Sequence, residues 1–188
     1  DFMRQAYQLG YHKLAFPEEV GGPGLNPLQI QIVMEELAWG SFGLTLNLNT
    51  TFDAAVAMAG SQEHVKEFTL PYCQCTDASY LGCWAITEPD HGSDTAAVGH
   101  PSFRDPNIPA QCRARLDGDD YVINGQKAAW VSNGPLANHI LLMCQVDASK
   151  GHAGGGMFIL DLDRPGISKG KPLSKLGIRD LCQGEVYF

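Results

Sequence analysis

The amino-acid sequence predicts an α+β protein, in which an N-terminal helical part precedes an antiparallel β-barrel or sandwich. Apolar residues recur at helical spacing in the first part, and near residue 80 the spacing changes to that of strands. The later strand-like runs are short and are separated by Gly, Asn and Asp turn signals, as in antiparallel β-folds. We therefore expect two domains, residues 1–78 and residues 79–188.

Capping residues mark the starts of the expected helices. Asn26 is a favourable N-cap and is followed by Pro27, which suits the first helical position. Ser61 resembles a second cap, and Pro71 is expected to stop the helix that follows it. The segment 43–59 is small and apolar on nearly all sides, which indicates a buried helix. The expected helices cover residues 2–9, 27–38, 43–59 and 61–70.

Turn signals separate the expected strands of the second part. Gly118-Asp119-Asp120 and Asn124-Gly125 are typical of tight turns. Residues 100–109 form a Pro-containing insertion, and the Gly-rich segment 150–156 is expected to be a flexible loop. The expected strands cover residues 81–87, 111–116, 121–127, 139–146, 156–162 and 184–188.

Composition narrows the class of protein. The formal net charge of −8 argues against a nucleic-acid partner, because phosphate binding needs clustered Lys and Arg. No apolar run is long enough to span a bilayer, and the first residues carry no signal-peptide pattern. Cys73 and Cys75 have no matching second pair for a zinc site, so we expect all six cysteines to be reduced thiols in a cytosolic protein.

Residues 84–94 are the most informative stretch of the chain. An apolar strand-like run ends on the hydroxyl of Thr87, Pro89 stops the strand, and Gly92-Ser93 forms a bend. Such a strand end exposes hydroxyls and backbone N–H groups, which suit a polar ring or a phosphate. The residues alone fit a simple strand and tight turn equally well.

Four ordered segments carry a resemblance to a known family. Residues 87–94 read T-E-P-D-H-G-S-D, and the other segments are residues 16–24, residues 123–134 and residues 175–188. Together they resemble the acyl-CoA dehydrogenase family of flavoproteins. Members of that family continue into a helical C-terminal domain. The chain begins without an initiator Met and ends on a strand-like run, so we expect a fragment that is inactive alone.

The resemblance implies that FAD is the cofactor and that two strands flank its ring. It matches Thr87 to the residue that bonds the pyrimidine edge, Ser93 to the pyrophosphate contact, Trp130 to the aromatic that shields the ring, and Ser132 to the hydroxyl near flavin N5. The implied cofactor-binding residues are Trp84, Ala85, Ile86, Thr87, Gly92, Ser93, Trp130, Val131 and Ser132.

Each of these residues also has an ordinary structural explanation. Trp130 fits a core aromatic, and Ser132-Asn133-Gly134 fits a common turn. Two departures from the family pattern also matter. Ala128-Ala129 stands where many members have one residue, which affects the register of Trp130. Leu181 and Gln183 replace a Ser and a Thr of the family.

The resemblance implies no catalytic base in this chain, because the family's base lies on the helical C-terminal domain. Ser93 and Glu88 are the implied substrate contacts, although Glu88 also fits a structural hydrogen bond. His91 is interpreted as an exposed loop histidine.

The implied function is FAD-dependent α,β-desaturation of an acyl-CoA thioester, with hydride transfer to flavin N5. The implied partners are an acyl-CoA substrate, an electron-transfer flavoprotein and further copies of the chain, as a dimer or homotetramer. The expected location is the bacterial cytoplasm, or the mitochondrial matrix in a eukaryote. Alternatives are a related flavoprotein oxidase, monooxygenase or DNA-damage-response protein, and a non-catalytic binding module.

Overall fold

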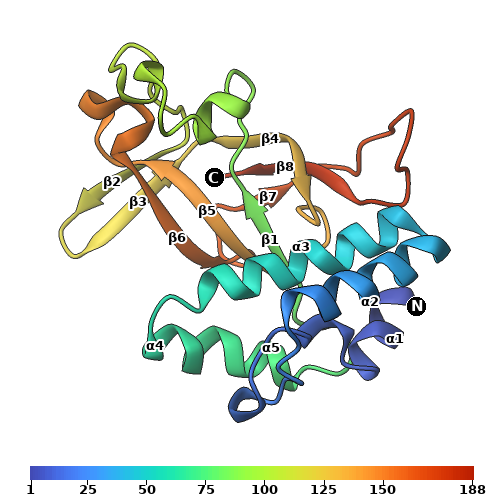
Figure 1. Cartoon of the computed structure of the whole chain (residues 1–188). Coiled ribbons are helices and arrows are strands. Elements are labelled where there is room, and N and C mark those ends of the chain that lie inside the picture. Colours follow the sequence, from blue (N-terminus) through green and yellow to red (C-terminus); the bar gives the residue numbers. More distant parts are fainter.

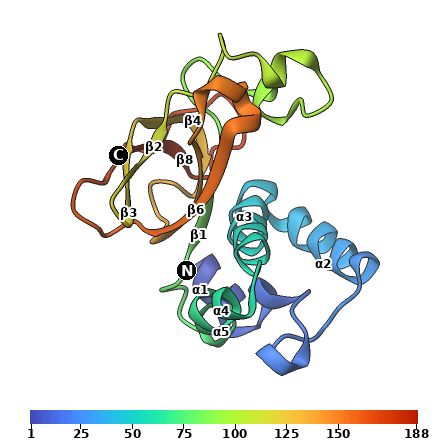
Figure 2. The same cartoon turned by 90° about the vertical axis from the view of Figure 1, so that its left-hand side faces the viewer.

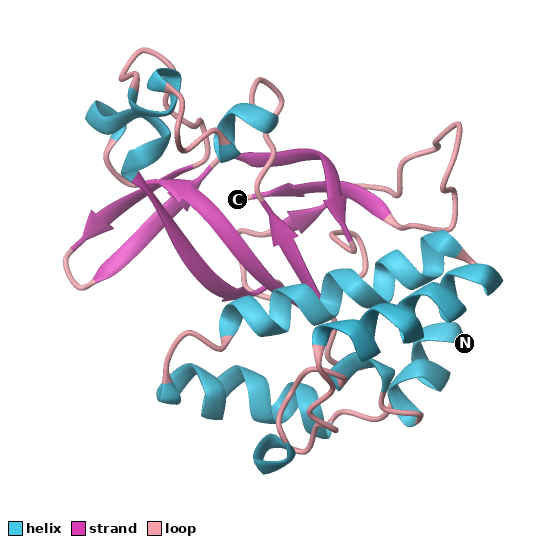
Figure 3. Cartoon of the chain, in the orientation of Figure 1, coloured by secondary structure: helices cyan, strands magenta, loops and turns pink.

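The structure is a computed structural model that describes residues 1–188, and its long helices lie apart from the strands, with short helical turns at the opposite end of the strands (Figure 3). All the long helices precede Gln74, and the first strand begins at Gly82. The helices lie along one side of the strands in both views (Figures 1 and 2). The helices are α1 (Phe2–Gln8), α2 (Pro27–Gly40), α3 (Phe42–Met58), α4 (Gln62–His64) and α5 (Leu70–Gln74).

The predicted start of α2 is confirmed in detail. The Asn26 side chain accepts a hydrogen bond from the Gln29 N–H at 3.0 Å, and the Gln29 side chain accepts one from the Asn26 N–H at 2.9 Å. This reciprocal capping box satisfies two N–H groups that the first turn leaves without helical partners. The first helix ends as expected, because Gly10 adopts the left-handed region with φ 79°.

The prediction that Pro71 ends the fourth helix is wrong. A π-helical turn, Val65–Thr69, joins α4 to α5, and Pro71 lies in the first turn of α5. The wider π turn accommodates a residue that lacks an N–H and would clash with the preceding turn of a regular α-helix. The helix therefore continues to Gln74.

The strands form two open sheets that pack as a sandwich. The larger sheet has five strands in the order β1-β5-β2-β3, with β6 also paired to β5, and the smaller has the order β4-β8-β7. Most pairs are antiparallel as expected, but β5 pairs in parallel with both β1 and β2. The strands are β1 (Gly82–Ala85), β2 (Arg113–Asp117), β3 (Asp120–Asn124), β4 (Gln126–Ser132), β5 (His139–Gln145), β6 (Gly155–Asp161), β7 (Ser168–Lys169) and β8 (Gln183–Tyr187).

Two strand predictions need correction. The expected strand 121–127 is divided at Gly125 between β3 and β4, which belong to different sheets. Gly125 has φ 144°, and a Cβ there would lie 2.5 Å from the Cα of Cys112, so the chain crosses between sheets where only glycine fits. The two-residue strand β7 was not expected from the pattern.

The Gly-rich segment 150–156 is more ordered than expected from composition. Residues Ala148–Gly154 form 3-10 turns, and His152 within them is buried. The Gln145 side chain donates hydrogen bonds to the carbonyls of Asp147 and Gly151, at 2.8 and 2.9 Å. These hydrogen bonds fix the conformation of the segment, which was predicted to be a flexible loop.

Helix α3 joins the helices to the strands. Its Thr51 hydroxyl accepts a hydrogen bond from the N–H of Gly82 at 2.7 Å, at the start of β1. Its Asn47 side chain donates to the carbonyl of Asp180 at 2.7 Å and accepts from the N–H of Cys182 at 3.1 Å. These buried polar contacts fix α3 against β1 and against the segment before β8, where the predicted site lies.

Candidate functional site

The two halves of the predicted flavin cradle lie side by side. Thr87, just beyond the end of β1, donates its hydroxyl proton to the carbonyl of Ala128 in β4 at 2.8 Å. The N–H of Ala128 donates back to the carbonyl of Thr87 at 3.1 Å. A hollow of about 350 Å³ opens beside this contact. Its lining residues are Thr87, Glu88, Pro89, Asp90, His91, Gly92, Ala128, Ala129 and Trp130.

A β-bulge in β4 presents Trp130 at this hollow. Gln126 and Lys127 pair with Tyr187 and Val186, but the next paired residues are Val131 and Gly184. The step from Lys127 to Val131 covers four residues, while the matching step on β8 covers two. The additional residue that the sequence shows at Ala128-Ala129 is therefore accommodated by a local bulge, which re-aims the side chain of Trp130.

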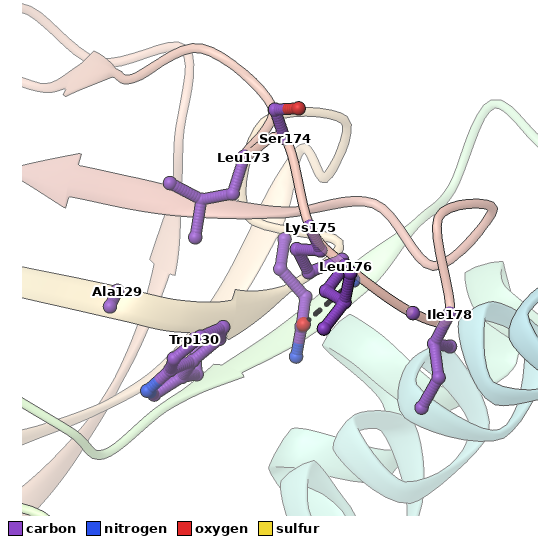
Figure 4. Close-up of a pocket in the computed structure, with 9 residues that line it drawn as sticks. Ala129, Trp130, Leu173, Ser174, Lys175, Leu176 and Ile178 are labelled. Atoms are coloured by element: carbon purple, nitrogen blue, oxygen red, sulfur yellow. Dashed lines mark hydrogen bonds between the residues drawn. The ribbon is translucent and has the colours of Figure 1, made fainter.

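Trp130 separates two neighbouring hollows. Its side chain is 58% exposed. Trp130 is therefore not a core aromatic residue, which was the alternative explanation for it. A second hollow of about 620 Å³ lies on its other side and shares Ala129 and Trp130 with the first (Figure 4). Residues 173–178 form the outer wall of this second hollow. The aromatic ring is thus placed where a flat ligand could lie against it.

Ser132 is oriented by a polar chain that sequence analysis did not assign. The Gln183 side chain donates to the Ser132 hydroxyl oxygen at 3.0 Å. Lys175 donates to the side-chain amide oxygen Oε1 of Gln183 at 2.8 Å (Figure 4). It also donates to the backbone carbonyl of Leu181 at 2.7 Å. Gln183, noted as a departure from the family pattern, therefore fixes the hydroxyl of Ser132.

The side chain of Glu88 is bonded to other residues inside the protein. Its carboxylate is fully buried and pairs with Lys127 Nζ at 2.8 Å. It also accepts hydrogen bonds from the backbone N–H groups of Gln111 at 2.5 Å and Cys112 at 3.0 Å. Lys127 donates in addition to the carbonyl of Ile86 at 2.8 Å. The expectation that the Glu88 side chain contacts substrate is therefore not retained, because both carboxylate oxygens already have partners inside the protein.

The turn that follows Glu88 is closed by its own backbone. The N–H of Glu88 donates to the carbonyl of His91 at 2.9 Å, and the N–H of His91 donates back at 3.3 Å. Gly92 lines the hollow, and the adjacent Ser93 is exposed at the start of a short 3-10 helix, Ser93–Ala96. Backbone bonding thus holds Ser93 next to the cradle.

The prediction that His91 is an exposed loop histidine is wrong. Its side chain is only 10% exposed, and its Nδ1 lies 2.8 Å from Asp94 Oδ2. Partial burial raises the pKa of Asp94, but hydrogen bonds from His91, the Gly92 N–H and His152 outweigh it and lower that pKa to about 2.

Some predicted cofactor residues face away from the hollow. The side chains of Ala85 and Val131 are buried in the hydrophobic core of the sandwich, so only their backbones are available to a ligand. Trp84 lines a separate hollow of about 560 Å³ against α2 and α3. Successive side chains of a strand point to opposite faces. Ala85 therefore points into the core while the neighbouring Trp84 lines this separate hollow. Ile86 lies half-buried next to a small internal cavity.

Two descriptions of one protein family match successive parts of the chain. The family description "Acyl-CoA dehydrogenase, N-terminal domain" matches residues 1–75, and "Acyl-CoA dehydrogenase, middle domain" matches residues 83–188. The short-chain specific acyl-CoA dehydrogenase of Bos taurus mitochondria is 32% identical over 184 residues, which cover 96% of this chain. The chain spans 41% of that relative's length.

Solved structures share the fold. Butyryl-CoA dehydrogenase from Megasphaera elsdenii superposes with a TM-score of 0.81 at 28% identity, over 99% of this chain and 46% of its own. An acyl-CoA dehydrogenase complexed with FAD from Bacillus anthracis gives a TM-score of 0.79 at 24% identity, over 98% of this chain and 29% of its own. With both family descriptions matched in order along nearly its whole length, the chain belongs to the acyl-CoA dehydrogenase family.

Proposed function

We propose that this chain holds FAD for the α,β-desaturation of an acyl-CoA thioester. The observation that carries the proposal is the contact between Thr87 and Ala128, which places the signature turn beside the bulge that presents Trp130. The hollows on the two sides of Trp130 suit a flat ring, and polar groups converge at their edge. Bound FAD would supply the acceptor for the hydride that leaves the substrate.

The hydrogen bonds support distinct proposed roles for the two hydroxyls. Thr87 commits its hydroxyl proton to Ala128, so its lone pairs remain to accept a hydrogen bond from a ring N–H. Ser132 accepts from Gln183, so its own proton is free to be donated to a ring acceptor. Trp130 would cover the ring and exclude water from it, and Ser93 with Gly92 would contact the pyrophosphate.

The proposed substrate, electron acceptor, oligomeric form and location are inferred from membership of the family. We propose an acyl-CoA as substrate, an electron-transfer flavoprotein as electron acceptor and a homo-oligomer as the working form, in the bacterial cytoplasm or the mitochondrial matrix. The division into residues 1–78 and 79–188 remains part of the proposal. No residue of this chain is proposed as the base that removes the α-proton. No helix of the structure has the length and hydropathy needed to cross a membrane.

Flavin titration tests the cradle directly. FAD binding to the 188-residue chain is followed by the change in flavin fluorescence, for the parent and for Thr87→Ala and Trp130→Ala. We expect each variant to bind FAD at least about tenfold more weakly, which corresponds to one lost hydrogen bond or one lost ring contact of about 1.4 kcal/mol. Trp39→Ala is the matched control, because Trp39 is exposed on α2. Equal affinities for all four proteins would show that the cradle is misplaced.

Reduction by substrate tests the reaction. The full-length, FAD-loaded protein is mixed without oxygen with acyl-CoA thioesters of different chain length, and loss of flavin absorbance is recorded. Bleaching supports the dehydrogenase, and its absence with every thioester contradicts it. Rapid reoxidation by air would favour the oxidase or monooxygenase alternative. Absence of FAD binding altogether would favour the binding module.

A further inference from the structure

Two histidines meet one carboxylate beside the signature turn. His91 Nδ1 lies 2.8 Å from Asp94 Oδ2, and His152 Nε2 lies 3.0 Å from the same oxygen. The two imidazole rings stand edge to face with centroids 4.9 Å apart. His152 lies 58 residues after Asp94 in the chain, so only folding brings the three side chains together.

The segment that carries His152 is held firmly. Gln145 bonds the carbonyls on both sides of the loop, as described above, and Gly151 adopts φ 60°. A Cβ at Gly151 would lie 2.6 Å from the carbonyl oxygen of Asp105, so the loop packs closely against the insertion around residue 105. The His152 side chain is consequently only 4% exposed. The segment that carries His152 is therefore positioned by contacts that do not involve Asp94.

The charge of Asp94 is not balanced by any permanent cation. No Lys or Arg forms an ion pair with Asp94, and its only side-chain partners are His91 and His152. An imidazole is ordinarily neutral near pH 7 and is a common ligand of transition metals. The carboxylate is 36% exposed, whereas the two imidazoles are buried, so an ion held here would keep an open side towards solvent.

The ligand types and their spacing fit one divalent ion. Zn²⁺ binds imidazole nitrogens at about 2.0–2.1 Å and carboxylate oxygens at about 2.0–2.2 Å. The three candidate ligand atoms lie within 4.8 Å of one another, so small rotations of the rings would bring all three onto one ion. Each imidazole would then carry its proton on the other ring nitrogen.

We propose that His91, Asp94 and His152 form a site for a divalent transition-metal ion of the zinc type. Two nitrogens and one oxygen from the protein leave a fourth position for water or an anion. The ion would tie the turn after β1 to the segment before β6, which the shared Asp94 oxygen already links. Ion binding therefore stabilises the folded chain. The proposal does not depend on flavin binding or on catalysis.

Cobalt substitution tests the site without an activity assay. Co²⁺ is titrated into the apo 188-residue chain, its visible d–d absorption is recorded, and Zn²⁺ is then added to displace it. The variants are His91→Gln and His152→Gln, because a glutamine amide can still donate a hydrogen bond to Asp94 but replaces the imidazole ligand. His64→Gln is the matched control, since His64 lies on α4 in the helical part. Circular dichroism confirms that each variant is folded.

We expect the parent and His64→Gln to bind one Co²⁺ per chain, displaced by one Zn²⁺, with a raised melting temperature in the presence of Zn²⁺. His91→Gln and His152→Gln should bind at least about tenfold more weakly and lose the thermal shift. The proposal is overturned if the folded Gln variants bind as tightly as the parent. It is also overturned if the parent binds no Co²⁺, or if an intense thiolate charge-transfer band shows that cysteines hold the ion.

Discussion

Replacing Lys127 by methionine tests how the two halves of the cradle are held together. The ammonium of Lys127 bonds Glu88 from the signature turn and the carbonyl of Ile86 after β1, although Lys127 itself lies on β4. The Lys127 side chain is 2% exposed and that of Glu88 is 0% exposed, so water cannot replace the lost partner. Methionine keeps most of the packing of the alkyl stem and removes only the charge and the donors.

The expected loss of stability comes from the buried polar groups that lose their partner in Lys127→Met. Glu88 would keep a buried negative charge with two backbone N–H donors and no cation, and the Ile86 carbonyl would lose its side-chain donor. Breaking a buried ion pair by removing one partner costs about 3–5 kcal/mol. We expect the free energy of unfolding of Lys127→Met to fall by that amount. Urea denaturation followed by tryptophan fluorescence and circular dichroism measures it.

An exposed ion pair in the same domain provides the control. Arg115 and Asp117 approach to 3.4 Å, with side chains 71% and 61% exposed. Arg115→Met should therefore change the free energy of unfolding by only about 0–1 kcal/mol. Lys127→Met combined with Glu88→Gln should cost about 0.5–3 kcal/mol less than the sum of the two single changes. A loss for Lys127→Met no larger than that of the control would refute a structural ion pair between the strands.

Three further outcomes follow from other parts of the chain. Gly125→Ala should lower the free energy of unfolding by more than about 1 kcal/mol in urea, because its Cβ would meet Cys112 and its φ of 144° disfavours a side chain. Burial lowers the pKa of His12 to about 4 from 6.5, so the unfolded chain binds more protons between these values. The free energy of unfolding should therefore rise with pH from about 4 to 6.5, and His12→Phe should flatten this rise; an unchanged slope would contradict the assignment. In the native protein, Ellman's reagent should modify only the half-buried Cys75 and Cys182, whereas all six thiols should react after unfolding.

Much of the fold was predictable because the relevant signals are local. The cap at Asn26, the left-handed residue Gly10 and the existence of a strand before Thr87 each depend on a few adjacent residues. The motif at residues 87–94 and the segment around Trp130 predicted the two halves of the proposed cradle for the same reason. Patterns of this kind lie in consecutive residues, so they can be recognised without knowing which distant residues they contact.

Contacts between distant segments were not predictable in this way. The sequence showed one additional residue near Ala129, but only the pairing of β4 with β8 turned it into a bulge that aims Trp130 outward. Lys127 looked like one polar residue at the end of a strand-like run, and His152 looked like part of a flexible loop.

The sequence by itself determined that helices precede strands, the family and the two segments of the proposed cradle. The tertiary structure alone decided that Glu88 is paired in the interior, that Ser132 is oriented by Gln183, and that His152 joins His91 at Asp94. The physical reason is that the partner of a buried polar group is chosen by the register and packing of segments far apart in the chain. A single sequence encodes these contacts only through the fold as a whole.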